Sequence, residues 1–186
     1  MKEILQFNVI NELKKITRMN SVGKRKGSVA EHTWSSMMLA DFFLEKEKLK
    51  IDRLKVYELL MYHDLLEIET GDIPILPELK NIDKEEIEKK AKKIFCKKIP
   101  EYHAKKFKKL SKEFEERVTL ESRFANAVDK LDVIIQILSH KTDLKGWSKK
   151  SIIEKKQKYF VEFPEINKKF KNILKSLECS GHLSKE

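Results

Sequence analysis

The sequence contains few residues of the kinds that stabilise small extracellular domains or interrupt helices. Its 186 residues include two cysteines, five glycines and four prolines. Cys96 and Cys179 are too few for a disulfide framework or for a zinc site of four thiolates, so we interpret both as reduced thiols in a cytoplasmic protein. The low content of glycine and proline is typical of a helical chain.

Long apolar segments are also absent. No run of residues reaches the length that crosses a membrane, and residues 1–6 lack the cationic start and apolar stretch of a secretory signal. We therefore expect a cytoplasmic location and no membrane contact. With 40% hydrophobic and 38% charged residues, a chain of this length forms one ordinary globular domain. We expect this domain to occupy residues 1–178, with a polar tail at 179–186.

The net charge of +10 comes mainly from lysine, because only five of the forty basic residues are arginine. The segment Lys84–Lys112 contains twelve lysines against four glutamates, and it is predicted to form two surface helices that separate near Pro100. We interpret these lysines as a solvated helical face; the alternative is a surface that binds nucleic acid. Without a glycine-rich phosphate loop, zinc-finger spacing or interleaved aromatic residues, nucleic-acid binding is not expected.

One acidic segment differs from this lysine-rich background. No lysine or arginine occurs at residues 56–79, which include His63, Asp64, Glu67 and Asp72. An acidic segment that contains histidine but no basic residue is a candidate for binding a cation. The alternative is a packed histidine that is hydrogen-bonded to a neighbour, with solvated acids around it.

The apolar periodicity predicts an all-α single domain, a bundle of about six to eight helices with no convincing strand. We expect the first helix to turn its apolar face inward and to lead into a cationic loop at residues 18–27. The long helix predicted at 115–140 carries Asp129 beside a buried apolar stripe. The predicted helices include residues 3–17, two helices within 84–112, and helices at 115–140, 149–159 and 165–178.

Two polar patterns predict helix starts. Ser28 and Glu31 have the spacing of a capping box, which gives Glu31 a structural role and argues against catalysis by it. Asp52 can cap the helix that runs into His63. Asp129 needs a partner because it lies among apolar positions, and a salt bridge to a nearby lysine is the alternative to a role in metal binding.

Separated segments of the chain together resemble the H…HD…D signature of the HD-domain metal-dependent phosphohydrolases. His32 follows Ser28-Val29-Ala30-Glu31, His63-Asp64 lies in the segment 56–79 that contains no lysine or arginine, and Asp129 lies in Ala127-Val128-Asp129-Lys130-Leu131. Glu67 and Asp72 have the E-x4-D spacing that is similar to the 5′-deoxynucleotidase branch of the family.

The resemblance implies that His32, His63, Asp64 and Asp129 bind a divalent metal ion. Two imidazoles and two carboxylates suit Mn²⁺, Co²⁺, Fe²⁺ or Zn²⁺ better than an ion that prefers thiolates, and Mg²⁺ is a further candidate. By the same resemblance, Glu67 would handle a proton or act on the attacking water. Asp72 would orient the water or the sugar, and Arg18 would bind phosphate. Charge and position alone add Lys24 and Arg25 as helpers of Arg18.

We therefore predict a metal-dependent phosphomonoesterase that acts on nucleoside 5′-monophosphates, and on deoxynucleotides in particular. Two alternatives stay open: an HD phosphohydrolase of a nucleoside triphosphate or cyclic nucleotide, and a non-catalytic module that binds RNA through the lysine-rich helices. The family resemblance also implies a homodimer.

Overall fold

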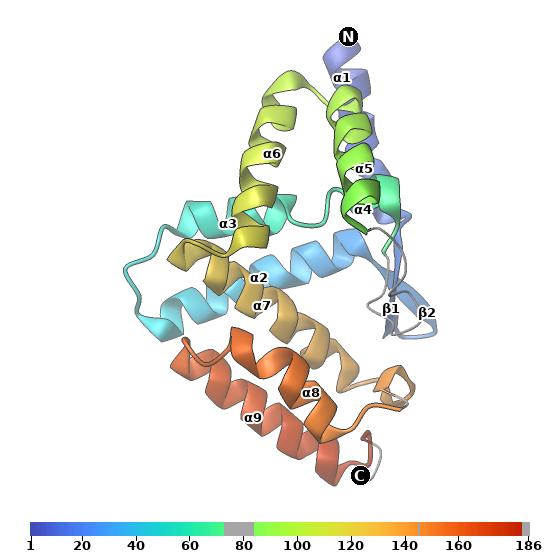
Figure 1. Cartoon of the computed structure of the whole chain (residues 1–186). Helices are drawn as coiled ribbons and strands as arrows, with labels where there is room; N and C mark the ends of the chain where they lie inside the picture. Colours follow the sequence, from blue (N-terminus) through green and yellow to red (C-terminus); the bar gives the residue numbers. More distant parts are fainter. Residues whose placement is uncertain (73–83, 145, 184–186) are drawn as a thin grey trace.

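The computed structural model describes residues 1–72, 84–144 and 146–183, and most of them are helical. Three helices, α2 (Val29–Glu47), α3 (Arg53–Tyr62) and α7 (Leu120–Ile137), pack against one another in the middle of the molecule (Figure 1). The other long helices are arranged around these three. The prediction of an all-α fold is confirmed.

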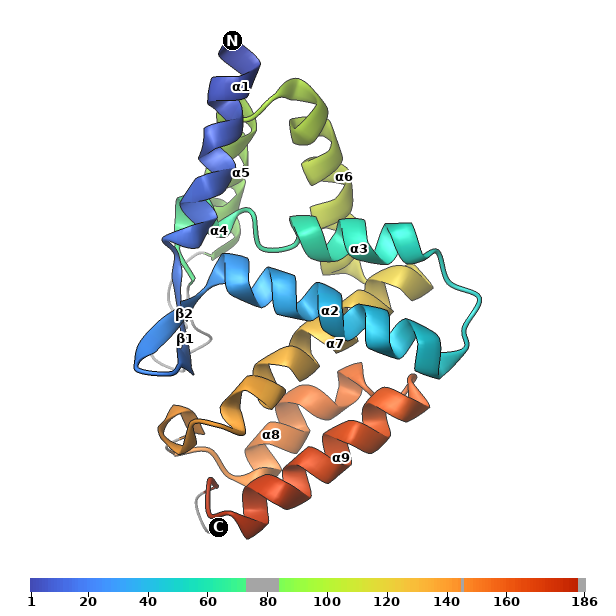
Figure 2. The same cartoon turned by 180° about the vertical axis from the view of Figure 1, so that it is seen from behind.

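The peripheral helices form two groups at opposite ends of the molecule (Figures 1 and 2). One group contains the N-terminal helix and the two lysine-rich helices, α5 and α6. The other contains α8 and α9, which lie side by side. The bounds are α1 (Lys2–Phe7), α4 (Glu67–Thr70), α5 (Lys84–Lys98), α6 (Glu101–Glu116), α8 (Lys149–Lys156) and α9 (Pro164–Cys179), with 3-10 helices η1 (Asn8–Lys14), η3 (Lys141–Leu144) and η4 (Gln157–Tyr159).

Aromatic side chains from nearly every long helix fill the core. Full burial of one such side chain contributes about 1.5–3 kcal/mol relative to leaving it in water, so these residues hold the peripheral helices against the central three. No helix among the described residues is long and apolar enough to cross a membrane. The fully buried phenylalanines are Phe43, Phe95, Phe107, Phe124, Phe160, Phe163 and Phe170.

The prediction of no strand is wrong in one place. The cationic segment that we expected to be a loop forms an antiparallel hairpin of β1 (Thr17–Val22) and β2 (Arg25–Ser28). Gly23 in its turn adopts φ +59°, a backbone conformation that glycine tolerates because it has no Cβ atom. The strands are short and polar and give no alternating apolar signal. A contact from a distant residue fastens the hairpin: the Ser21 backbone N–H donates to Asp143 Oδ2 at 2.6 Å.

The first helix also differs from the prediction. The α-helix ends at Phe7, a 3-10 helix follows, and Thr17 already belongs to β1. The 3-10 helix packs against α2 and α4 and buries Leu13. Ile4 and Leu5, which we expected to face inward, are 72% and 60% exposed. An apolar period therefore identified the helix but not its surroundings.

The long helix predicted at 115–140 is shorter, because the chain turns before it begins. Arg117 ends α6 in the left-handed conformation, at φ +54°. Thr119 then caps α7 by accepting a hydrogen bond from the Ser122 backbone N–H at 3.2 Å. The two glutamates at 115 and 116 belong to α6.

The predicted caps at the other helices are confirmed. The Ser28 side chain accepts from the Glu31 backbone N–H, and the Glu31 side chain accepts from the Ser28 backbone N–H, which makes a complete capping box. Asp52 caps α3 by accepting from the Lys55 backbone N–H. Gly71-Asp72-Ile73-Pro74 is a sequence typical of a turn. Gly71, at φ +71°, ends α4, and Ile73 and Pro74 lie outside the described residues.

Candidate metal centre and phosphate site

The first pair of candidate ligands comes from two helices that are far apart in the sequence. His32, on the first turns of α2, and Asp129, in the middle of α7, are each only 3% exposed. His32 Nε2 lies 2.9 Å from Asp129 Oδ1. The other ring nitrogen, Nδ1, lies 2.8 Å from Asp132 Oδ2. Asp132 is one helical turn after Asp129, so a single face of α7 contacts both sides of the His32 ring.

The second pair is at the end of α3. His63 Nδ1 lies 2.7 Å from the backbone oxygen of Leu60, which only a protonated nitrogen can contact favourably. When the ring is neutral, this bond leaves Nε2 unprotonated, with a lone pair that can bind a cation. His63 Nε2 is 3.0 Å from Asp64 Oδ2 and 3.8 Å from Asp129 Oδ1. His32 Nε2 is also 3.8 Å from Asp64 Oδ2, so the four predicted ligands lie around one point.

Three of these residues, His32, His63 and Asp129, could together hold a metal ion. His63 Nε2 is buried and has no hydrogen-bond partner among the described residues, although Asp64 Oδ2 lies 3.0 Å away. One ligand atom from each of His32, His63 and Asp129 lies within 4.8 Å of the other two. Ring nitrogens and carboxylate oxygens that converge in this way, with His63 Nε2 left unpaired, are arranged for a cation. The mixed nitrogen and oxygen donors suit Mn²⁺, Fe²⁺, Co²⁺ or Zn²⁺.

The electrostatics of the cluster also favour a bound cation. Burial opposes a charge on His32, but hydrogen bonds to Asp129 and Asp132 outweigh it and raise the pKa of His32 to about 9. Burial likewise opposes ionisation of Asp64, yet its nearness to His63 leaves the pKa of that carboxyl below its usual value. The acids therefore attract positive charge to the ring nitrogens, and a metal ion would supply that charge in place of a proton.

Glu67 and Asp72 face the same cluster from the segment after α3. The Glu67 backbone N–H donates to the Asp64 carbonyl at 3.0 Å, so the chain turns directly after Asp64. Glu67 Oε2 is buried and has no hydrogen-bond partner among the described residues. Burial first, and then the Asp64 and Asp72 carboxylates, raise the pKa of Glu67 to about 8. Burial and Asp64 also raise the pKa of Asp72, while Arg18 opposes the shift.

Arg18 brings a cation from the hairpin to this acidic group. Its side chain is 13% exposed, and its Nη1 donates to Asp64 Oδ2 at 3.2 Å. The Nε atom is buried and has no partner among the described residues, so the guanidinium has donor capacity left for an anion. Burial opposes the charge, but nearby Asp64, Asp72 and Asp129 together keep the pKa of Arg18 above its ordinary value.

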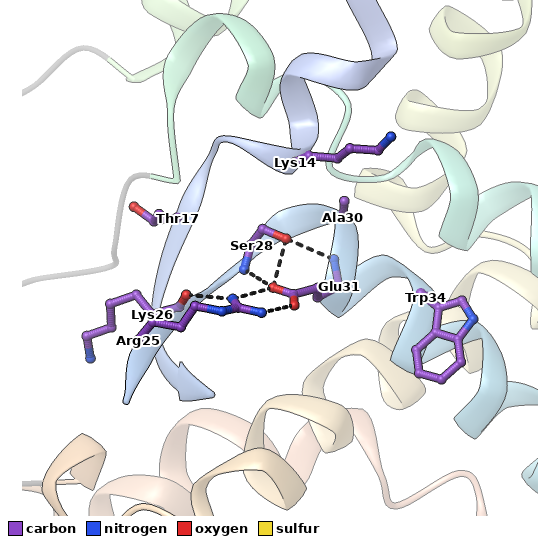
Figure 3. A pocket seen from close by; sticks show the side chains of 8 residues that line it. All are labelled: Lys14, Thr17, Arg25, Lys26, Ser28, Ala30, Glu31 and Trp34. Carbon is purple, nitrogen blue, oxygen red and sulfur yellow. Dashed lines mark hydrogen bonds and ion pairs between the residues drawn. The ribbon is translucent and has the colours of Figure 1, made fainter. Parts of the chain in front are cut away.

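The two other predicted phosphate ligands lie elsewhere on the hairpin. Lys24 is exposed in the turn, and Arg25 donates from Nη2 to Glu31 Oε1 at 2.5 Å. Figure 3 shows Arg25 and Glu31 on the wall of a pocket of about 580 Å³, together with the Ser28 cap. Arg25 thus fastens the hairpin to α2. The pocket is lined by Lys14, Thr17, Arg25, Lys26, Ser28, Ala30, Glu31 and Trp34.

The sequence analysis assigned no role to three polar residues beside the cluster. Asp132, with Ser35 donating to it at 2.8 Å, orients His32. Lys130 Nζ lies 2.6 Å from Asp129 Oδ2, which is the salt bridge considered as the alternative role of that carboxylate. It occurs together with the His32 contact, because the two partners use different oxygens. Lys156, from α8, lies within electrostatic range of Lys130 and Asp129.

Residues 10–173 match a family model of the HD domain. The chain therefore belongs to the HD domain family, which confirms the resemblance to the HD-domain phosphohydrolases. Among curated proteins, the 5′-deoxynucleotidase HDDC2 of Xenopus laevis is 27% identical over 143 residues, covering 75% of this chain and 70% of the relative. The Homo sapiens HDDC2 is 27% identical over 139 residues, covering 73% and 67%.

Solved structures with the same fold have similar lengths. A predicted metal-dependent phosphohydrolase from Magnetospirillum magnetotacticum superposes with a TM-score of 0.87 at 24% identity, over 99% of this chain and 95% of that one. An HD-domain phosphohydrolase from Listeria innocua gives a TM-score of 0.66 at 23% identity, over 92% and 88%. At these identities the likeness establishes the fold.

Proposed function

We propose that this protein is a metal-dependent phosphomonoesterase that hydrolyses nucleoside 5′-monophosphates, deoxynucleotides in particular, to nucleoside and phosphate. The observation that carries the proposal is the buried, unpartnered His63 Nε2 atom, which faces carboxylates of Asp64 and Asp129 next to the arginine Arg18. Metal ligands beside a free guanidinium donor form a site for a phosphate group. The similarity to HDDC2 supports the choice of nucleotide.

When bound, the metal ion would lower the pKa of a water molecule and polarise the phosphate. The residues of this chain supply the remaining functions. His32, His63, Asp64 and Asp129 hold the ion. Arg18 binds phosphate oxygens with the planar fork of its guanidinium group, which Lys cannot reproduce.

Glu67 and Asp72 are proposed to handle protons and to orient groups. Glu67 has a buried carboxylate oxygen without a partner, three residues after Asp64, so it can take a proton from the attacking water or give one to the leaving 5′-oxygen. Asp72 lies at the end of the same segment, close enough to Arg18 for the two charges to interact. Its position allows it to orient the water or a sugar hydroxyl.

We also propose a homodimer in the cytoplasm. The location rests on the two free cysteines, Cys96 and Cys179, and the dimer on the resemblance to the family. We propose that the lysine-rich helices α5 and α6 form a solvated surface, because some of their lysines pair with glutamates of this protein. Examples are the ion pairs Lys92–Glu115 and Lys98–Glu69.

The test is a screen for products with the purified protein and each of Mn²⁺, Co²⁺, Fe²⁺, Zn²⁺ and Mg²⁺. Release of orthophosphate from deoxynucleoside 5′-monophosphates, absent after chelation of the metal, is the expected result. Pyrophosphate or triphosphate released from a nucleoside triphosphate, or a monophosphate formed from a cyclic nucleotide, would instead identify a different HD phosphohydrolase. No product from any nucleotide, together with salt-sensitive RNA binding, would favour the binding module.

A further inference from the structure

Phe114, in the last turn of α6, lies against the ring of a proposed metal ligand. Its ring centroid is 5.0 Å from that of His63, and the two ring planes are tilted by 49°. The His63 side chain is only 1% exposed, and Phe114 is itself partly buried. None of the predicted site residues is on α6, so this contact adds another helix to a cluster built from α2, α3 and α7.

The hydrogen bond of His63 alone does not fix the plane of its ring. Nδ1 lies 2.7 Å from the Leu60 backbone oxygen, which holds one edge of the imidazole. The ring can still tilt about that edge, and Nε2 moves with every tilt. Close packing of a second ring restricts this motion. The His32 ring is also near, with its centroid at 5.6 Å and a tilt of 59°, but it is itself a proposed ligand. Phe114 has no ligand atom, so it can hold His63 without binding the ion.

A buried amide on α7 holds the backbone of Phe114. The Asn126 side chain donates from Nδ2 to the Phe114 backbone oxygen at 2.8 Å and to the Ser122 backbone oxygen at 2.9 Å. Asn126 is 6% exposed, so breaking either bond would leave a buried polar group unpaired. It precedes Asp129 by three residues on α7. The same part of α7 therefore carries one proposed ligand and fixes the residue that contacts another.

The neighbouring residue, Glu113, joins the end of α6 to both ligand-bearing helices. Lys55 Nζ, on α3, lies 2.7 Å from Glu113 Oε2, and the two side chains are 24% and 12% exposed. The hydroxyl group of Thr119, the N-cap of α7, donates to Glu113 Oε1 at 2.8 Å. α6 also packs along both helices (Figure 1). The position of the Phe114 ring is thus fixed relative to α3 and α7 together.

We propose that Phe114 is a positioning residue of the metal centre, which holds the His63 ring so that Nε2 stays directed at Asp64 and Asp129. These carboxylate oxygens lie 3.0 and 3.8 Å from Nε2. The proposal rests on the proposed function, because it assumes that His63 binds the metal ion. Residues that orient a ligand from outside typically change metal affinity about 10- to 100-fold when they are lost. A phenylalanine that only fills space would contribute to stability and leave that affinity unchanged.

The experiment separates positioning from packing. Phe114→Leu keeps an apolar side chain but removes the flat ring. Phe107→Leu is the matched control, because Phe107 is on the same helix, is fully buried and packs against Phe95 with a centroid distance of 4.9 Å. Co²⁺ is the probe, since the visible spectrum of the bound ion reports the geometry of its ligands. Titration with a competing chelator measures affinity, and thermal melting of the metal-free proteins measures stability.

We expect Phe114→Leu to bind Co²⁺ about 10- to 100-fold more weakly than the wild type, with an altered visible spectrum. Phe107→Leu should melt at a lower temperature because it leaves a cavity in the core, yet it should bind Co²⁺ with wild-type affinity and spectrum. An unchanged affinity in Phe114→Leu would overturn the proposal. An equal loss of affinity in Phe107→Leu would also overturn it, because affinity would then follow general packing.

None of these measurements requires hydrolysis, so the inference and the proposed function can fail separately. A protein that hydrolyses no nucleotide but loses Co²⁺ affinity in Phe114→Leu would refute the proposed function and support this inference. A protein that hydrolyses nucleotides and binds Co²⁺ equally well with Phe114 or leucine would do the reverse. A wild-type protein that binds no Co²⁺ would overturn both.

Discussion

Arg18 Nη1 lies 3.2 Å from Asp64 Oδ2, so the candidate phosphate ligand is bonded to a candidate metal ligand. The same Asp64 oxygen lies 3.0 Å from His63 Nε2. A metal ion that shares this oxygen would weaken its bond to the guanidinium group and leave more of the arginine fork for phosphate. The proposed metal and phosphate sites are thus adjacent, with the Asp64 carboxylate next to both.

Arg18→Ala is expected to keep the metal and weaken substrate binding. The lost charged hydrogen bond is worth about 1.5–3 kcal/mol, and Arg18→Lys should recover only part of it because lysine lacks the planar fork. Metal content by elemental analysis and KM for a nucleotide, measured on the same preparations, check this expectation. Wild-type kinetics in Arg18→Ala would move phosphate binding to other cations, with Lys24 and Arg25 as the next to be replaced.

His63→Ala and Asp64→Ala are expected to lose both metal and activity while they remain folded. Each removes a proposed ligand atom from the cluster. The wild type should melt at a higher temperature when metal is added, because an ion at 100 times its Kd stabilises the native state by about 2.7 kcal/mol. Both variants should lack this shift. Metal content equal to that of the wild type would contradict the assignment.

Asp132→Asn is expected to weaken the metal site without removing a ligand. Its carboxylate lies 2.8 Å from His32 Nδ1 and holds the ring so that Nε2 faces Asp129. Losing a partner of this kind typically costs about 10- to 100-fold in metal affinity. Titration with a competing chelator measures the change. As a matched control, Asp41→Asn removes an exposed carboxylate that accepts a hydrogen bond from Tyr57, and its metal affinity should stay unchanged.

Glu67→Gln and Asp72→Asn are expected to keep the metal and lose catalysis. Groups that transfer protons in the transition state typically contribute about 10²–10⁴-fold in rate. Metal content and single-turnover rate should be measured on the same preparations. Asp72→Asn should also reduce the preference between deoxyribose and ribose. Loss of metal from Glu67→Gln would make it a ligand, and unchanged rates would remove both residues from the mechanism.

Lys156→Met is expected to change how stability depends on pH. The pKa of Lys156 is about 8 in the folded protein, below its ordinary value of 10.5. Between these values the unfolded chain binds more protons than the folded one, so this lysine makes the free energy of unfolding rise with pH. Lys156→Met removes that contribution. Its stabilising effect should be largest below pH 8 and should shrink toward pH 10.5.

Urea denaturation of the metal-free proteins at several pH values measures this difference. Subtracting the wild-type curve cancels the titration of other groups, and Lys150→Met serves as the control for the loss of an exposed lysine. A difference between Lys156→Met and the wild type that does not vary with pH would contradict the lowered pKa of Lys156.

Much of the candidate site was predictable because several of its residues lie close together in the sequence. His63 and Asp64 are adjacent, and Glu67 follows by one helical turn, so the segment without lysines already placed them together. His32 and Asp129 are far from it in the chain, and the resemblance to the HD signature connected them. The structure brings these residues together; their roles remain predictions.

The rest depended on contacts that no local pattern contains. Lys156 lies in an ordinary lysine-rich helix, and no sequence pattern links it to Asp129. The short polar strands of the hairpin give no strand signal. Part of the hairpin's stability comes instead from Asp143, over a hundred residues later, which accepts hydrogen bonds from Ser21. Arg25 was chosen for its charge, and its pairing with Glu31 depends on how β2 enters α2. Distant partners of polar side chains are set by tertiary packing rather than by periodicity.

The sequence separation of 97 positions between His32 and Asp129 also has a consequence for the order of folding. In a zinc finger, nearby ligands let the metal organise a short stretch of chain. Here no short stretch holds the ligand set, so the ion cannot act as an early nucleus. The entropy of closing a long loop must be overcome by the packing of α2, α3 and α7 before the ligands meet. Metal uptake therefore reports a late event, the completed assembly of the central helices.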